Sequence, residues 1–157
     1  MITTGVEAAA LLAEAREYLE AHDVLTLATV DDGGAWATPL FYASDERLDL
    51  YVLSDPGTRH CAAIHRYPRV SAAVHDACRS WREITGLQLR GDAGPVADAA
   101  LGAGLERYAA KFPFALGLCR PGGPHRLYRI RPTWLRLIDN ARGLGAKREL
   151  HLAGGEP

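Results

Sequence analysis

Short runs of apolar and β-branched residues, separated by turns rich in glycine and aspartate, dominate the first half of this sequence. In the clearest case, runs from Val24 to Val30 and from Ala35 to Tyr42 flank the turn Asp31-Asp-Gly-Gly34. This pattern predicts an antiparallel hairpin, because Asp-Gly and Gly-Gly adopt the tight turns that join paired strands. Proline has no N–H for a strand ladder. Pro39 therefore predicts an edge or a bulge in the second strand, with nearby backbone groups free for a ligand.

Further strands are predicted by alternation at residues 48–53, 70–75, 81–91 with an extension toward 96, 125–131 and 134–139, the last two being separated at Pro132. Helices are predicted at residues 5–21, 58–66 and 98–111. The first follows the capping box Thr4-x-x-Glu7, and the third has Asp98 as its N-cap. Six or seven short strands with few helices indicate a mainly β (α+β) fold, an antiparallel barrel or sandwich.

Composition restricts both the class of protein and its partners. A chain of 157 residues is long enough for one domain, so residues 1–157 are expected to form a single unit with an irregular tail after about residue 140. A net charge of -1 argues against nucleic-acid binding, which needs a basic surface. Early charges such as Glu7 and Glu14 argue against a signal peptide, and no window is apolar enough for a membrane span, so we expect a cytoplasmic protein.

Metal and disulfide chemistry find little support in the sequence. The three cysteines, Cys61, Cys78 and Cys119, are widely separated and form no C-x-x-C pair. The histidines lack metal-ligand spacing, so no metal site is expected.

The residues between the third predicted strand and the helix at 58–66 are typical of an anion site. Thr58, Arg59 and His60 come together at a helix start, where unpaired N–H groups and the helix dipole favour negative charge. Ser54, at the end of the preceding strand, can add a hydroxyl. Arginine offers two parallel donors to a phosphate, and histidine assists when it is protonated. The pattern predicts binding of a terminal phosphate dianion.

The order of these motifs resembles that of the pyridoxamine 5'-phosphate oxidase-like family of FMN-binding split barrels. Four segments between residues 24 and 150 carry the resemblance: the hairpin from Leu25 to Leu40, the stretch from Ser54 to Val70, the strand ending Leu89-Arg-Gly-Asp-Ala93, and the segment from Arg129 to Asn140. The ending Asp139-Asn-x-x-Gly-x-Gly-x-Lys147 is similar to a bacterial branch of the family without an assigned reaction.

The resemblance implies a split β-barrel of six to seven strands with flanking helices, and a homodimer with FMN at each subunit interface. It implies that Thr58, Arg59 and His60 hold the flavin phosphate, with His60 in the place of the usual lysine. It also implies that the ring lies along the second strand and near the third. The remaining contacts that it implies are Ala37, Thr38, Pro39, Leu40, Leu53, Ser54 and Gln88, with Asn140, Lys147 and Arg148 from the second subunit.

Departures from the family pattern leave the reaction open. Gly86 occupies the position of a flavin-contacting glutamine, so Gln88, on the same strand face, is the substitute candidate. The Arg-x-His pair that binds the substrate phosphate is absent around residues 144–147, which argues against vitamin B6 oxidation. We expect an FMN-dependent oxidoreductase acting on an unknown small molecule. The alternatives are a deazaflavin-dependent reductase and a non-catalytic flavin- or haem-binding protein, with His60, His65 or His125 as the haem ligand. Trp81 is a further candidate for a ligand contact.

Overall fold

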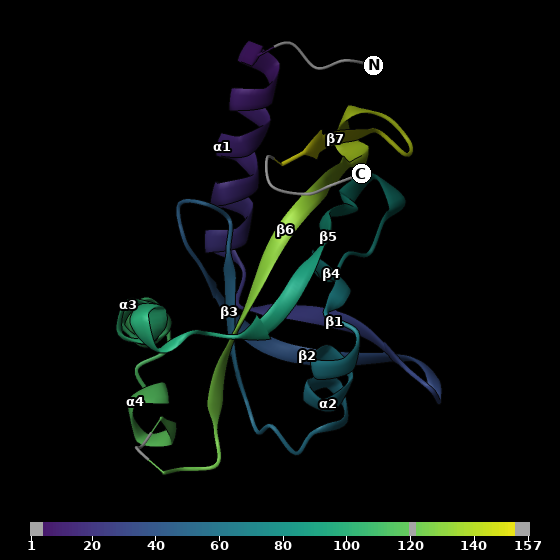
Figure 1. Cartoon of the computed structure of the whole chain (residues 1–157). Coiled ribbons are helices and arrows are strands. Elements are labelled where there is room, and N and C mark those ends of the chain that lie inside the picture. The colour runs from purple at the N-terminus through teal and green to yellow at the C-terminus, as the bar shows by residue number, and fades with distance from the viewer. Residues whose placement is uncertain (1–4, 120–121, 153–157) are drawn as a thin grey trace.

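The computed structural model describes residues 5–119 and 122–152. Within these residues, seven strands form one antiparallel sheet in the order β3-β2-β1-β4-β5-β6-β7, and a β3–β6 pairing closes six of them into a barrel (Figure 1). The strands are β1 (Val24–Asp31), β2 (Gly34–Ser44), β3 (Leu50–Ser54), β4 (Arg69–His75), β5 (Thr85–Pro95), β6 (Arg126–Asp139) and β7 (Lys147–His151). The helices are α1 (Gly5–Ala21), α2 (Arg59–Arg66), α3 (Asp98–Lys111) and α4 (Ala115–Leu118), with 3-10 turns η1 (Trp81–Glu83) and η2 (Asn140–Arg142). The predicted antiparallel barrel is confirmed.

The barrel is split between β2 and β3. Residues 42–44 of β2 pair with β3, whereas residues 34–41 pair with β1 alone. Tyr42 donates its N–H to Asp23 on the β1 side, so by alternation the N–H groups of Ala35 and Ala37 face the open edge. The nitrogen of Pro39 faces the same edge, where no ladder bond is lost. The edge position predicted from Pro39 is confirmed.

One strand, β6, runs through the position where two strands were predicted. The sequence prediction of separate strands at 125–131 and 134–139 is wrong, because Arg126–Asp139 is continuous and pairs with β3, β5 and β7. Its register with β5 shifts so that Arg90 pairs with Trp134 and Gly91 with Pro132, which leaves Thr133 as a bulge. A proline is tolerated at such a bulge, so Pro132 bends the strand without ending it.

The C-terminal segment also differs from expectation. The prediction of an irregular tail after about residue 140 is wrong, because η2 and β7 lie there and β7 pairs with β6 from Trp134 to Ile138. Arg148 of β7 binds Glu14 of α1 through both guanidinium NH2 groups, and this ion pair lowers the pKa of Glu14. The strand is therefore fixed by partners far away in the sequence.

Helix ends and loops show smaller differences. The expected capping residue Thr4 lies outside the described residues. In α3 the N-cap is Ala97, and Asp98 is the first helical residue. Gly117 lies in the short helix α4. In the β2–β3 turn, Leu48 is buried with a φ of 68°, in the left-handed region.

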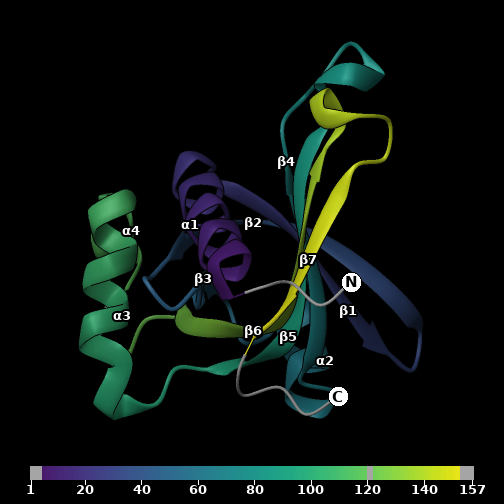
Figure 2. The same cartoon turned by 90° about the horizontal axis from the view of Figure 1, so that it is seen from above.

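Two apolar cores organise the molecule. The larger fills the barrel and includes Leu11, Ala15 and Leu19 of α1. The smaller lies where α3 and α4 cover the strands beside β3, and it contains Tyr51, Tyr108 and other residues. Figure 2 shows the helices α1, α3 and α4 gathered on one side of the sheet. No helix of residues 5–119 and 122–152 is both long enough and apolar enough to cross a membrane.

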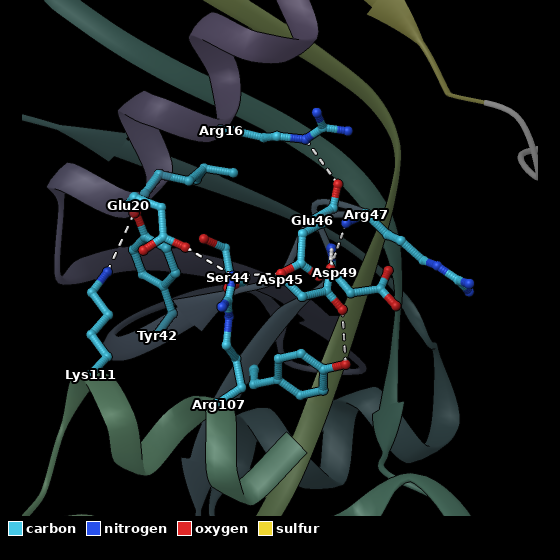
Figure 3. A network of polar contacts seen from close by, with 12 residues as sticks. Arg16, Glu20, Tyr42, Ser44, Asp45, Glu46, Arg47, Asp49, Arg107 and Lys111 are labelled. Carbon is cyan, nitrogen blue, oxygen red and sulfur yellow. Dashed lines mark hydrogen bonds and ion pairs between the residues drawn. The ribbon is translucent and has the colours of Figure 1, made fainter. Parts of the chain in front are cut away.

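Polar contacts join α3 to the elements beside it. Figure 3 shows Arg107 and Lys111 extending from α3 toward α1 and the β2–β3 turn. Arg107 donates to the Ser44 carbonyl and pairs with Glu20, while Lys111 donates to the carbonyls of Leu19 and His22. These contacts hold α3 against α1 and the β2–β3 turn. The open edge of β2 lies farther toward the start of that strand, at residues 34–41.

Gly91→Ala tests the bend in β6. A Cβ at residue 91 would lie 2.1 Å from the Arg131 carbonyl oxygen and 2.8 Å from the Pro132 Cα, both of which are backbone atoms. We expect the free energy of unfolding to fall by about 2 kcal/mol or more, since backbone must move to relieve the overlap. Urea denaturation would measure it. Gly94→Ala is the control, because its Cβ meets nothing within 4 Å on the same strand. Equal stability of the two variants would contradict the role of Gly91 in allowing the bend of β6.

Candidate functional site

The three residues predicted to hold a phosphate gather where β3 leads into α2. The Ser54 hydroxyl lies 2.7 Å from His60 Nε2, and the Thr58 hydroxyl lies 3.2 Å from the same nitrogen. Ser54 and His60 are each only 6% exposed. His60 thus faces into the protein and fixes two hydroxyls at the helix start. Its imidazole is not exposed on the surface.

The first turn of α2 is without a side-chain cap. Thr58 is the N-cap residue, but its hydroxyl donates to the Asp55 carbonyl at 2.8 Å and makes no capping hydrogen bond. A helix start without a cap leaves backbone N–H groups that an anion can accept from, and the helix dipole adds to the attraction. The feature that suggested an anion site in the sequence is therefore present in the fold.

Arg59 is held by a residue that sequence analysis missed. Its Nε donates to Asp31 Oδ2 at 2.6 Å and its Nη2 to Asp31 Oδ1 at 2.9 Å, and the guanidinium lies 4.4 Å from the centre of the Trp36 ring. The hydrogen bonds to Arg59 hold the pKa of Asp31 below its ordinary value. The only sequence signal for this contact was the acidic turn between two strands, and it did not indicate which cation would lie opposite.

The open edge of β2 lies beside this helix start, since Trp36 and Asp31 both contact Arg59. Ala37, Thr38, Pro39 and Leu40, the predicted contacts along the flavin ring, form part of that edge. The buried hydroxyls of Thr29 and Thr38 have no hydrogen-bond partner among the described residues. A buried hydroxyl without a partner is costly, so both groups retain unused hydrogen-bonding capacity. Leu53 is half-buried at the end of β3.

A polar cluster lies beneath α2. Cys61 is fully buried, and Tyr128, 1% exposed, places its hydroxyl 3.4 Å from His65 Nε2. Burial raises the pKa of the Cys61 thiol, but hydrogen bonds with its neighbours outweigh burial and lower the pKa to about 7. These neighbours are His60, Thr58, Ser54 and Tyr128. The thiol is enclosed, so we interpret the cluster as structural: its hydrogen bonds hold the residues at the start of α2 in place.

Gln88 lies on a different part of the sheet. It belongs to an open pocket of about 360 Å³ on the outer face of β1, β4, β5 and β6, and Arg136 donates to its side-chain oxygen at 3.3 Å. The small side chains of Thr26, Ala28 and Ala73 line much of this pocket, with Arg90 and Trp134 at one side. Arg90 lies 4.6 Å from the centre of the Trp134 ring.

The three residues expected from a second subunit lie far from α2 in their own chain: β7 and α2 are at opposite ends of the molecule (Figure 1). Asn140 donates to the Trp81 carbonyl at 2.7 Å and accepts from the Gly145 N–H at 3.0 Å, so it orders its own turn. Arg148 is paired with Glu14, and Lys147 is exposed. Trp81 is 48% exposed on η1.

The three histidines considered as haem ligands differ in availability. His60 and His65 are bonded within the fold. His125 has a buried Nδ1 without a partner among the described residues. Within residues 5–119 and 122–152, no group of three or more His, Cys, Asp or Glu side chains could hold a metal ion.

These features define an antiparallel split barrel with an uncapped helix start beside an open strand edge. The family model described as Pyridoxamine 5'-phosphate oxidase matches residues 11–139. The chain therefore belongs to the pyridoxamine 5'-phosphate oxidase family, and the resemblance found in the sequence is confirmed. A UPF0306 protein of Yersinia pseudotuberculosis serotype O:1b is 30% identical over 141 residues, covering 89% of this chain and 91% of that protein.

Solved structures agree on the fold. A heme binding protein from Mycobacterium smegmatis matches with a TM-score of 0.75 at 19% identity, over 89% of this chain and 57% of that chain. A FAD-binding protein from Mesorhizobium loti matches with a TM-score of 0.63 at 23% identity, over 78% and 88%. At such identities the likeness shows the split barrel alone.

Proposed function

We propose that this protein binds FMN and acts as a flavin-dependent oxidoreductase on a small molecule. The observation that carries the proposal is the uncapped start of α2, with Thr58, Arg59 and the Ser54 hydroxyl around it, directly beside the open edge of β2. FMN has a phosphate monoester at one end and a planar ring at the other. The phosphate would lie at the start of α2, and the ring would lie along the edge of β2. Family membership supports the same assignment.

The residues present fit this cofactor. Arg59 donates from Nε and Nη2 to Asp31, so an arriving phosphate first meets Nη1 and the first-turn N–H groups of α2. The N–H of Ala37 and the unpartnered hydroxyl of Thr38 are donors for polar atoms of the ring. Bound FMN would supply reversible transfer of a hydride or of electrons, and this chain would bind and orient it. A deazaflavin phosphate would use the same groups.

Haem is the second candidate. The unpartnered Nδ1 of His125 favours it, because the other two histidines considered are bonded within the fold. The structural likeness to a protein described as heme binding supports haem as the alternative ligand. Haem would place the function in storage or transfer, or in a reaction of the haem itself.

Arg59→Ala tests the phosphate site. We expect it to weaken FMN binding by about 1.5 to 3 kcal/mol, the scale of a charge-assisted hydrogen bond, with little effect on riboflavin, which lacks the phosphate. Fluorescence titration would measure both affinities. Arg66→Ala is the matched control, since Arg66 lies on the same helix and is also paired with an aspartate, Asp32. A loss of under a few tenths of a kcal/mol would place the phosphate elsewhere.

Haem and flavin are separated by absorbance and thermal unfolding of the purified protein. FMN in excess should raise the unfolding temperature, because a ligand that binds the folded state stabilises it by mass action. Haem addition should produce no histidine-dependent Soret band. A Soret band that His125→Ala abolishes and His151→Ala retains would instead favour the haem assignment. Failure of FMN to raise the unfolding temperature would count against the flavin assignment.

We also propose that the protein is a homodimer, with the outer face around Gln88 against a second copy. That face is a sheet without a covering helix, and small side chains such as Ala28 and Ala73 leave it open to close packing. Val24 and Val30 lie on β1 at this face and are 43% and 53% exposed. A closed two-fold dimer buries such a face on both copies at once.

Ala28→Arg tests this interface. A long charged side chain at the centre of the face should prevent close packing, so we expect a monomer where the unaltered chain is a dimer at micromolar concentration. Sedimentation velocity would measure the state. Ala9→Arg, on the exposed side of α1, is the control and should remain dimeric. A monomeric unaltered chain would refute the dimer.

A further inference from the structure

The turn between β1 and β2 is fastened to α2 at two points. Asp31 accepts two hydrogen bonds from Arg59, and the next residue, Asp32, is paired with Arg66 and accepts from the Tyr67 hydroxyl at 3.4 Å. The two arginines are seven residues apart, which is two turns of an α-helix, so they lie on the same side of α2. The turn therefore lies along the helix.

The two fastenings differ in what else the arginine can bind. Arg59 is the first residue of α2, where the uncapped N–H groups and the helix dipole attract an anion. Arg66 is the last residue of the helix, where the dipole has the opposite sign. Only the Asp31–Arg59 pair therefore involves a donor that the phosphate site also needs.

Asp31 is well fixed as an acceptor. Its Oδ1 also accepts the Gly33 N–H at 2.8 Å, and a Cβ at Gly33 would lie 2.9 Å from Arg59 Nη2, so the turn lies close against the guanidinium. The hydrogen bonds from Arg59 lower the pKa of Asp31, so its carboxylate stays charged wherever a phosphate monoester is a dianion. A phosphate approaching Arg59 meets a negative charge already in place.

We propose that Asp31 is a specificity-determining residue of the phosphate site: an internal anion that a phosphate monoester must displace from Arg59. This inference rests on the proposed FMN function. It means that FMN binding must also break the hydrogen bonds between Asp31 and Arg59. A dianion that uses several donors at the helix start can replace the carboxylate, whereas a weaker anion cannot. The Asp32–Arg66 pair keeps the turn attached to α2 after Asp31 is released.

The proposal predicts opposite roles for two adjacent aspartates. Asp31→Asn removes the competing charge and keeps the side-chain shape, so we expect FMN to bind about two- to fivefold more tightly, the range of a partly exposed ion pair. Riboflavin affinity should change by less than about twofold, because it carries no phosphate. Asp32→Asn, the matched control, should leave both affinities within about twofold. Fluorescence titration of the full chain would measure all of these affinities.

Hydrogen–deuterium exchange on the unaltered chain provides a second measurement that does not depend on any variant. FMN should speed exchange in residues 31–34, because the Gly33 N–H loses its acceptor when Asp31 moves, and riboflavin should not. Faster exchange with FMN alone supports displacement. Unchanged or slower exchange in the turn overturns it.

The outcomes separate this inference from the function beneath it. If the unaltered chain binds FMN and Asp31→Asn binds it equally or more weakly, Asp31 positions Arg59 instead of competing with it, and the inference fails while the proposed function stands. If neither the unaltered chain nor the variant binds FMN or riboflavin, the proposed function fails and the inference fails with it. Tightening of FMN and riboflavin to the same degree would also refute a phosphate-specific role.

Discussion

The close approach of Gly91 to the backbone of Arg131 and Pro132 is the constraint on which the rest of the fold depends. With no side chain at residue 91, β6 can shift its register at Thr133 and bend, so that one half pairs with β3 and the other with β7. The β3–β6 pairing closes the barrel, while β3 pairs with three residues of β2, Tyr42 to Ser44. The open edge of β2 is a consequence of how the barrel closes on its other side. The candidate site lies at that edge because β3 leads into α2 there.

Local signals predicted the elements around the site well. Alternation and the Asp-Asp-Gly-Gly turn predicted the hairpin, and Pro39 predicted an edge, since both depend on the conformation of neighbouring residues. The helix start near Thr58 follows from the same kind of signal. Pro132 was misread as the end of a strand because its tolerance depends on the bulge opposite Gly91, which only the paired structure reveals. The strand β7 was missed for a related reason: Lys147–His151 has little apolar alternation and is fixed by β6 and by Glu14 of α1.

Counting basic residues at a helix start overstates the charge that a ligand meets. Arg59 and His60 follow Thr58 directly, and in the sequence they look like two cations available to a phosphate. In the fold, Asp31 offsets one of them, from 28 residues away along the chain, and the other turns inward to Ser54. What remains for an anion is the helix dipole, the first-turn N–H groups and part of one guanidinium. The residue types were read correctly, while their electrostatic effect depended on a tertiary contact that no local pattern contains.

The same distribution of donors bears on which planar ligand the opening suits. A flavin phosphate needs an anion site and hydrogen-bond donors along one edge, and both lie together around α2 and β2. A haem needs a histidine nitrogen that is free to bind iron. His60 and His65 contact Ser54 and Tyr128, and withdrawing His60 would disturb the hydroxyls of the candidate anion site. His125 precedes β6, and no contact of its side chain with the helix start is among those of the described residues. Haem at His125 would therefore leave the uncapped helix start without a ligand, whereas the proposed FMN would occupy both it and the strand edge.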